Sequence, residues 1–421
     1  MNLVLYAIPA FVVLLLIELY ADYRCRTGYY RTNDAIASLS TGILNQTMGF
    51  ATKFAGFLAY ISLWQLLPHP ELAMNPWLWV AAFVIYDFCY YWKHRCQHQI
   101  NVLWGIHVVH HQSEEYNLTT ALRQPFNGFL VGALFYLPML FMGFPPEVVI
   151  TVGSLNLIYQ YWVHTRFIGH LGLFEWFFVT PMNHRVHHAI NDPYIDKNFG
   201  GVFILWDRLF GTYQAELEEE PCAYGVRKPL HSWNPFFANW HVHWQLLQDA
   251  WHARRWRDKL RLWFMPTGWR PEDVARDYPL PRCLPETQRK YDKAPAGPLV
   301  AAVVALHLLL MGYTLWFLFV AMNESFATSA LHFIPLGGGL WMNARLLDQR
   351  SGAAPMAVLF WLGCAALPWL EGVWHGSSWL LPTGATVLIA AVVAAGLLLA
   401  MVLGTAREPA KAPAGGAPAG D

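Results

Sequence analysis

Apolar residues form long runs along most of this chain, and short polar stretches separate them. A helix that crosses the apolar core of a bilayer takes about 20 residues, so each long run predicts a membrane-spanning helix. Pro145 and Pro146 divide one pair of runs, because proline breaks a helix. The expected spans are 3–20, 41–67, 77–92, 127–143, 147–163, 298–320, 327–343, 355–371 and 379–404. The pattern therefore predicts an all-α, multi-pass bundle of about nine transmembrane helices.

The polar remainder completes the expected organisation. Residues 165–297 are polar enough to lie outside the bilayer, and the tail after 404 is rich in proline, glycine and alanine, which is typical of disorder. The expected domains are N-terminal helices at 1–76, a metal-binding core at 77–230, a cytosolic or interfacial helical segment at 231–297, a four-helix membrane region at 298–404 and a disordered tail at 405–421.

Composition supports a membrane protein. Hydrophobic residues make up 55% of the chain and charged residues only 13%, whereas about a quarter of the residues in a soluble domain are charged. The net charge is zero, so the chain has no basic footprint for nucleic acid. Its six cysteines form no C-x2-C pair, which argues against a disulfide framework or an iron–sulfur cluster. The first run lacks a cleavage signal and is expected to remain as a span.

Lysine and arginine indicate the orientation. With nine spans, nearly all of them fall on one side of the membrane, and the opposite loops near 68–76, 144–146, 321–326 and 372–378 contain none. Positive residues favour the cytoplasmic side. The long segment 165–297 is therefore expected to face the cytoplasm, from the inner membrane of a bacterium or the endoplasmic reticulum of a eukaryote.

Eight histidines occur in three spaced clusters, HRCQH, HVVHH and HRVHH. Residues three or four apart lie on one face of a helix, so each cluster presents several imidazoles together. One zinc ion takes three or four protein ligands, and eight imidazoles suit two ions. The candidate ligands are His94, His98, His107, His110, His111, His184, His187 and His188.

Imidazole suits iron, copper and zinc. An iron pair held by neutral nitrogen ligands is suited to O2 chemistry on an unactivated C–H bond, for which the protein supplies orientation and excludes water. The clusters lie at the ends of spans three and five, where a lipid can enter sideways from the bilayer. A membrane metal transporter or store is the alternative, but transporters place their ligands near the bilayer midplane.

His164 ends the fifth span and joins the candidate ligands, whereas His170 has poorer helical spacing and ranks below it. Asp87 and Tyr91 share a helical stripe with His94, so the carboxylate is expected either to hold the free N–H of a ligand histidine or to pair near the membrane interface. Further candidates for supporting the site are Glu114, Asn117, Asp196 and Asn198, the last two of which also suit a turn.

A second helical pattern follows the third cluster. Trp240, Trp244, Leu247 and Trp251 recur at helical spacing, and a basic stretch follows at 254–261. Such a helix lies in the membrane interface or packs on the cytosolic cap; both interpretations stay open. His231, His241, His243 and His252 do not converge on one face and are not expected to bind metal.

The three histidine clusters in this order resemble the fatty acid hydroxylase superfamily, whose members act on sterols and fatty acids. The longer segments HHQSEEYNLTTALRQ and HRVHHAINDPYIDKNFGGVFILWDRLFGTYQAE are most similar to the branch that cleaves alkylglycerol ethers. The likeness is strong over roughly 80–230. Gln99 and Asn183 depart from the family pattern, in which an acidic residue and a histidine are usual at these two positions.

The resemblance implies a non-haem di-iron monooxygenase with two Fe ions held by the eight cluster histidines and His164. It implies hydroxylation by O2 of the carbon beside an ether oxygen, followed by breakdown to a fatty aldehyde and a glycerol derivative. It also implies an external electron donor, tetrahydrobiopterin. The alternative within the superfamily is a sterol or fatty-acyl hydroxylase or desaturase, because the histidine clusters do not separate these reactions.

Overall fold

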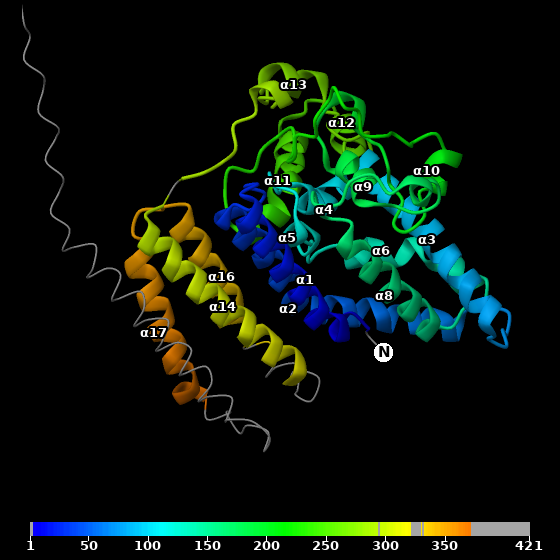
Figure 1. The fold of residues 1–421 in the computed structure, drawn as a ribbon, viewed down its shortest axis with the longest axis horizontal. Helices are drawn as coiled ribbons and strands as arrows, with labels where there is room; N and C mark the ends of the chain where they lie inside the picture. The colour runs from blue at the N-terminus through cyan, green and yellow to red at the C-terminus, as the bar shows by residue number, and fades with distance from the viewer. Residues whose placement is uncertain (1–2, 294, 321–329, 331, 372–421) are drawn as a thin grey trace, which may run out of the picture. The chain divides into compact units, whose positions relative to one another are not determined.

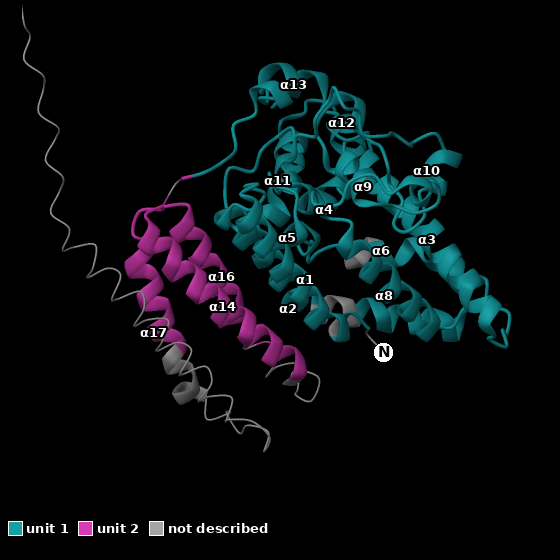
Figure 2. Cartoon of the chain, viewed as in Figure 1, with its two compact units in different colours: residues 1–292 teal, residues 293–421 magenta. Residues whose placement is uncertain are grey.

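The structure is a computed structural model, and it describes residues 3–293, 295–320, 330 and 332–371. Within these ranges every regular element is helical, and only three isolated β-bridges pair extended residues. The predicted all-α class is therefore confirmed. The chain forms two compact units, residues 1–292 and 293–421 (Figure 2). The finer domain boundaries expected at 76 and 230 stay predictions.

Unit 1 carries the long N-terminal helices and a cap of shorter ones (Figure 1). Its α-helices are α1 (Leu3–Cys25), α2 (Thr32–Leu66), α3 (Pro76–Gln99), α4 (Asn101–His111), α5 (Leu118–Ala121), α6 (Phe129–Phe135), α7 (Leu137–Phe141), α8 (Pro146–Trp162), α9 (Pro181–His188), α10 (Leu205–Leu209), α11 (Pro235–His252), α12 (Trp256–Arg261) and α13 (Glu272–Asp277). Short 3₁₀ turns lie at η1 (Gly172–Trp176), η2 (Asp192–Tyr194) and η3 (Pro285–Thr287).

Two helices extend beyond the expected spans, and one of them, α3, carries the first histidine cluster. Helix α3 begins after Asn75, whose side chain accepts hydrogen bonds from the backbone N–H groups of Trp77 and Leu78. It continues past the expected end at 92 as far as Gln99, so His94 lies on the same continuous helix as the apolar span. Helix α2 starts nine residues before the expected position 41, and its first turns are polar and buried.

The expected span 127–143 is not one continuous helix. The structure breaks this segment into α6 and α7, with the break at Tyr136. Pro138 lies in the first turn of α7. Proline has no N–H to donate and its ring clashes with the preceding turn, so it cannot continue α6 and instead begins a new helix.

Helices α3 and α8 pack closely beneath the cap. A Cβ atom added to Gly153 on α8 would lie 2.7 Å from the hydroxyl of Tyr86 on α3, so a larger residue at this crossing would displace the Tyr86 ring. A core of buried residues surrounds the crossing and includes Ala82, Met139 and Val152. The close approach places the end of α8, where His164 follows, beside the end of α3, where His94 lies.

Unit 2 contains α14 (Gly297–Val320), α16 (Phe333–Leu347) and α17 (Ala353–Glu371). The expected span 379–404 and the expected disordered tail lie outside the described residues. In the described part of the chain, two helical segments are long and apolar enough to cross a membrane, Tyr6–Cys25 and Gly297–Phe319. The predicted number of nine spans is therefore not confirmed.

Candidate metal centre

Nine histidines converge on one place in unit 1. They form two groups, and in each group one ring nitrogen of every member lies within 4.8 Å of the others. The first group is His94, His98, His107, His111 and His187, and the second is His110, His164, His184 and His188. All nine side chains are buried. The structure thus brings together every histidine that the sequence proposed as a ligand.

Helical spacing divides the clusters between the two groups. On α4, His107 and His111 are one turn apart and join the first group, whereas His110 points to the second. On α9, His187 joins the first group, whereas His184 and His188 join the second. The H-x2-HH spacing therefore lets one short helix contribute to two neighbouring centres.

Backbone carbonyls fix the orientation of several imidazoles. The Nδ1 atoms lie at hydrogen-bonding distance from carbonyl oxygens, 2.8 Å from Phe199 for His94, 3.0 Å from Arg123 for His110 and 2.8 Å from Gln160 for His164. A carbonyl only accepts, so each Nδ1 carries the proton. The Nε2 atom of each ring then has a free lone pair, as a metal ligand requires.

These lone pairs face one another. The Nε2 atoms of His94 and His107 are 2.8 Å apart, and those of His110 and His164 are 3.2 Å apart. His110 and His164 both carry their proton on Nδ1, so neither can donate to the other across this contact. In addition, Nε2 of His98 and of His187 is buried without a hydrogen-bond partner in the described chain. A cation between the rings satisfies these nitrogens, so the donor set fits a metal in each group.

Burial keeps the imidazoles neutral. Desolvation lowers the pKa of His110 to about 4 and that of His187 to about 3, because a buried site disfavours the charged form. Neither group contains a carboxylate ligand. Two bound divalent ions would therefore keep most of their positive charge, in contrast to sites that mix histidine with acidic ligands.

The lowered pKa values predict a loss of stability in acid. In the unfolded chain these histidines take up protons near pH 6.5, while the folded chain resists protonation until a lower pH. Stability of the metal-free protein is thus fully present above about pH 6.5 and falls as the pH drops towards about 4. Thermal unfolding of chelator-treated protein at several pH values measures this effect. A melting temperature that does not change between about pH 7 and about pH 5 would contradict the neutral, buried state of the histidines.

Known proteins resemble this chain in the region that carries the histidine clusters. The sequence profile described as fatty acid hydroxylase matches residues 79–212, which include all nine histidines. The chain is 33% identical over 360 residues to alkylglycerol monooxygenase of Danio rerio, covering 84% of this chain and 79% of that protein. The chain belongs to the fatty acid hydroxylase family.

Other relatives match shorter stretches. Alkylglycerol monooxygenase of Xenopus tropicalis is 36% identical over 68% of this chain, and that of Homo sapiens is 37% identical over 63%. The matched segment spans 64% and 59% of the length of these two relatives. An ornithine lipid hydroxylase of Rhizobium tropici is 26% identical over 45% of this chain. No solved structure matches the chain.

Asp87 does not bond directly to a ligand histidine. Its oxygens accept hydrogen bonds from the backbone N–H groups of Val202 and Phe203 at 2.8 and 3.0 Å, and from the side chains of Asn156 and Trp206 at 2.7 and 2.9 Å. The expected contact with the N–H of a ligand histidine is therefore wrong, because all four donors belong to other residues. Asp87 instead fixes the loop whose Phe199 carbonyl orients His94.

Tyr91 is fully buried beside the same loop. Its hydroxyl lies 3.0 Å from that of Thr212 and accepts a hydrogen bond from Arg95 at 3.1 Å. Its ring packs against those of Phe199 and Phe210, with centroids 6.3 and 5.4 Å away. Tyr91 therefore supports the loop by packing and makes no hydrogen bond to a candidate ligand.

Glu114 and Asn117 hold the segment that follows α4. Glu114 pairs with Arg31 at 2.9 Å and accepts a hydrogen bond from the backbone N–H of Tyr291 at 2.7 Å. Asn117 caps α5 and donates to the carbonyl of Tyr29 at 2.8 Å. Both are structural partners of the N-terminal segment, and neither belongs to a histidine group.

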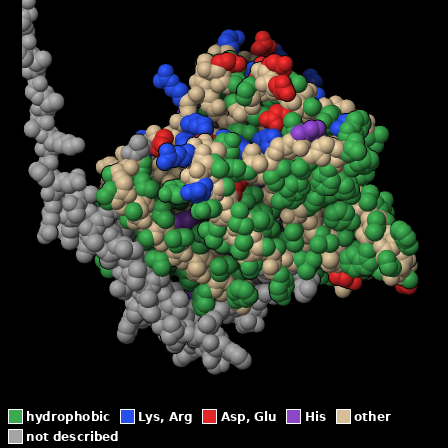
Figure 3. Space-filling view, in the orientation of Figure 1, with side chains coloured by type: hydrophobic (Ala, Val, Ile, Leu, Met, Phe, Trp, Pro, Cys, Tyr) green, Lys and Arg blue, Asp and Glu red, His purple; other side chains and the backbone are tan. Residues whose placement is uncertain are grey.

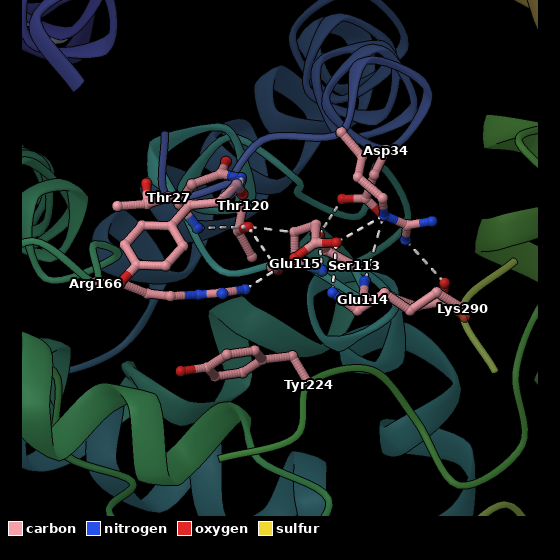
Figure 4. Close-up of polar contacts among 12 residues, drawn as sticks. Thr27, Asp34, Ser113, Glu114, Glu115, Thr120, Arg166, Tyr224 and Lys290 are labelled. Carbon is pink, nitrogen blue, oxygen red and sulfur yellow. Dashed lines mark hydrogen bonds and ion pairs between the residues drawn. The ribbon is translucent and has the colours of Figure 1, made fainter. Parts of the chain in front are cut away.

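The neighbouring Glu115 connects four segments and was not singled out by the sequence. Its carboxylate is 1% exposed and contacts Arg31 at 2.7 Å, Arg166 at 2.9 Å and Lys290 at 2.6 Å (Figure 4). The guanidinium of Arg166 also lies over the ring of Tyr224, 4.8 Å from its centroid. Since Arg166 follows His164 by two residues and Glu115 follows His111 by four, this network joins the two ligand-bearing segments.

Asp196 and Asn198 both adopt a left-handed backbone conformation, with φ of 58° and 55°, which asparagine and aspartate tolerate better than most residues. Asn198 donates to the carbonyls of Asn183 and Gln214 at 2.9 and 2.7 Å, so it ties α9 to the following loop. Asp196 is 44% exposed, and its carboxylate lies 3.8 Å from Nδ1 of His98, beyond hydrogen-bonding distance.

Two further residues position ligands and were missed by sequence reasoning. Asp207 is buried and accepts from the backbone N–H groups of Phe199 and Gly200 at 2.7 and 2.8 Å; burial raises its pKa to about 6. Arg185, between two ligands on α9, donates to the carbonyls of Thr165 and Ile168 at 3.3 and 2.8 Å. The only signal in the sequence is a charged residue within a largely apolar or histidine-rich stretch.

Among the described residues, His170, His241 and His243 belong to neither group. His170 pairs with Glu175 at 2.5 Å and its side chain is 65% exposed. His241 is buried beside the carbonyl of Ala238, and His243 lies 3.2 Å from the carbonyl of Val102. Neither His241 nor His243 belongs to a metal group among the described residues.

Proposed function

We propose that this chain is an O2-dependent lipid monooxygenase that holds two iron ions in the two histidine groups. The convergence of nine buried imidazoles, with unprotonated nitrogens facing one another, carries the proposal. Imidazole is a suitable ligand for iron, and the chain belongs to a family of hydroxylases. When bound, the iron pair supplies the redox chemistry that inserts one oxygen atom of O2 into a C–H bond.

In this chemistry the protein holds and orients the ligand imidazoles and excludes water from the site. The carbonyls of Phe199, Arg123 and Gln160 keep the proton of three ligand imidazoles on Nδ1. Asp87 and Asp207 keep the loop that carries Phe199 in place. Burial of all nine side chains keeps bulk water away from the reacting centre.

The proposed substrate is an alkylglycerol ether, since the relatives named alkylglycerol monooxygenase are 32–37% identical to this chain. Hydroxylation of the carbon beside the ether oxygen uses O2, two electrons and two protons, and releases water. The resulting hemiacetal breaks into a fatty aldehyde and glycerol. We propose a reduced pterin, tetrahydrobiopterin, as the electron donor, as the resemblance implies.

A multi-pass arrangement with about nine spans, and with the metal centre at the cytoplasmic side, is part of the proposal. Apolar side chains on α1 are largely exposed, among them Val13 at 55%, Leu16 at 58% and Ile17 at 58%. Hydrophobic side chains also gather over the lower part of unit 1, whereas charged ones gather over its upper part, around α13 (Figure 3). Such a large apolar surface needs a bilayer to cover it.

One experiment tests the reaction and its substrate together. Purified, iron-loaded protein is incubated with an alkylglycerol and tetrahydrobiopterin, and fatty aldehyde is measured with and without O2. Aldehyde is expected only when all three are present, with close to two iron ions per chain. No aldehyde, but O2-dependent turnover of a sterol or acyl lipid, would favour the alternative within the family, to which the 26% identity with an ornithine lipid hydroxylase also points.

A metal transporter or store is less consistent with the site. The ligands lie on α3, α4 and α9 and at His164, two residues after the end of α8. All are buried, and the imidazoles of His94, His110, His164 and His187 are held by backbone carbonyls. A transporter would place its ligands near the bilayer midplane in broken helices. Metal content that exchanges freely during turnover would be the observation in its favour.

A further inference from the structure

Helix α11 shows the reverse of the usual pattern for a helix on a protein surface. Its inner side packs on α4 and buries Ala238, His241 and Leu246. The outer side, which a helix exposed to water makes polar, is apolar and aromatic. The exposed fractions are 45% for Phe237, 49% for Trp240, 60% for Trp244, 51% for Leu247 and 81% for Trp251.

The same pattern continues into α12. Trp256, Leu260 and Phe264 are spaced by four residues and are 75%, 69% and 74% exposed. Asp258 and Leu262, on the opposite side, are buried. We call the eight exposed side chains from Phe237 to Phe264 the aromatic face. A contiguous run of large exposed apolar groups marks a surface that another apolar phase covers.

The start of α11 is attached to a segment at the expected membrane boundary. The side chain of Asn239 accepts from the backbone N–H of Phe126 at 3.1 Å, and its carbonyl accepts from Asn127 at 3.3 Å. The ring of Trp240 packs edge-on against that of Phe126, with centroids 6.0 Å apart. Residue 127 begins the segment expected to enter the bilayer, so this end of the aromatic face lies at the level of the interface.

Basic side chains lie beside the aromatic face. Arg254 and Arg255 precede α12, Arg257 lies in its first turn, and all three side chains are exposed. The Lys259 ammonium lies over the ring of Trp256, 5.5 Å from its centroid. Tryptophan rings prefer the boundary between lipid and water, and flanking cations are attracted to anionic head groups. Tryptophan and arginine are also enriched in protein interfaces, so it is the attachment of α11 to the segment at the expected membrane boundary that selects a lipid surface.

We propose that the aromatic face lies flat in the cytoplasmic surface of an anionic bilayer, with Arg255 and Arg257 among the lipid head groups. This contact rests on the proposed membrane topology, which places residue 127 at the interface, and it does not depend on the proposed reaction. Because α11 packs on α4, which carries three candidate ligands, the contact holds the metal centre close to the membrane from which a lipid substrate enters.

Brominated lipids test the proposal, because they quench only tryptophans in contact with the bilayer. The full chain is placed in nanodiscs of phosphatidylcholine and phosphatidylglycerol, as one copy per disc. It is compared with the variant Trp244→Tyr/Trp251→Tyr/Trp256→Tyr, in which three of the 21 tryptophans are replaced. The matched control, Trp233→Tyr/Trp263→Tyr/Trp269→Tyr, removes three buried or half-buried tryptophans from the same unit.

The first variant should lose at least one seventh of the lipid-quenched emission, because its three rings are all quenchable, and the control should lose much less. The variant Arg255→Gln/Arg257→Gln should reduce quenching in anionic discs and leave it unchanged in discs of phosphatidylcholine alone. Equal losses in the two tryptophan triples would overturn the proposal. Quenching of the tryptophans by aqueous iodide gives a second test. If the aromatic face is protected from iodide only when two copies share a disc, a second copy of the chain is its partner, and the proposal is overturned.

Discussion

Replacing His107 by alanine should abolish turnover and lower the iron content from about two ions per chain to about one or less. His107 lies at the centre of the first histidine group, with Nε2 2.8 Å from that of His94 and 3.2 Å from that of His111. Loss of even an indirect partner of a metal ligand costs about 10–100-fold, so removal of a ligand should cost more. His188→Ala should do the same in the second group.

His170→Ala is the matched control. This histidine follows His164 by six residues, but it is exposed and pairs with Glu175 away from both groups. Its replacement should leave iron content and turnover close to those of the unchanged chain, whereas His164→Ala should lower both. Iron is measured by elemental analysis of the purified variants. Full activity of His107→Ala or His188→Ala would remove that residue from the ligand set.

Asp87→Ala should produce the largest loss of stability outside the ligands. Its carboxylate accepts from two buried donors, of Asn156 and Val202, and from two partly buried donors, of Phe203 and Trp206. A buried donor left without a partner costs about 1–3 kcal/mol, so the two buried donors alone should cost about 2–6 kcal/mol. The loop that positions His94 should loosen, and iron should be lost with it.

Asp196→Ala is the control for Asp87→Ala, because it removes a carboxylate from the same region of the chain. Asp196 is 44% exposed and makes no close hydrogen bond to His98, so the variant should unfold within a few degrees of the unchanged chain. The melting temperature and the iron content of both variants are measured in detergent and compared. A melting temperature for Asp87→Ala equal to that for Asp196→Ala would show that the four donors find other partners.

Sequence spacing was sufficient to find the histidines because ligand geometry is encoded locally. On a single helix, residues three or four apart share a face, so HRCQH, HVVHH and HRVHH each identify a helix with ligands on one side. The nine predicted positions are the nine that converge. The resemblance to the fatty acid hydroxylase family rested on the same segments and is confirmed by the match over residues 79–212.

The supporting residues were not predictable in this way. Asp87 shares a helical stripe with His94, yet three of its four partners, Val202, Phe203 and Trp206, lie more than a hundred residues later. Glu115 likewise pairs with Arg31 and Lys290, which are distant in the sequence. Local periodicity gives the face on which a side chain lies, and it contains no information about which distant segment packs there.

The sequence by itself determined the helical class, the positions of most helices and the identity of the candidate ligands, since these depend on contacts within a few residues. Only the tertiary structure decided how the ligands divide, with His107 and His111 in one group and His110 in the other. It also decided that the tryptophans of α11 face outward. Both outcomes depend on how helices pack across long sequence distances, where side-chain shape and hydrogen bonding select one arrangement.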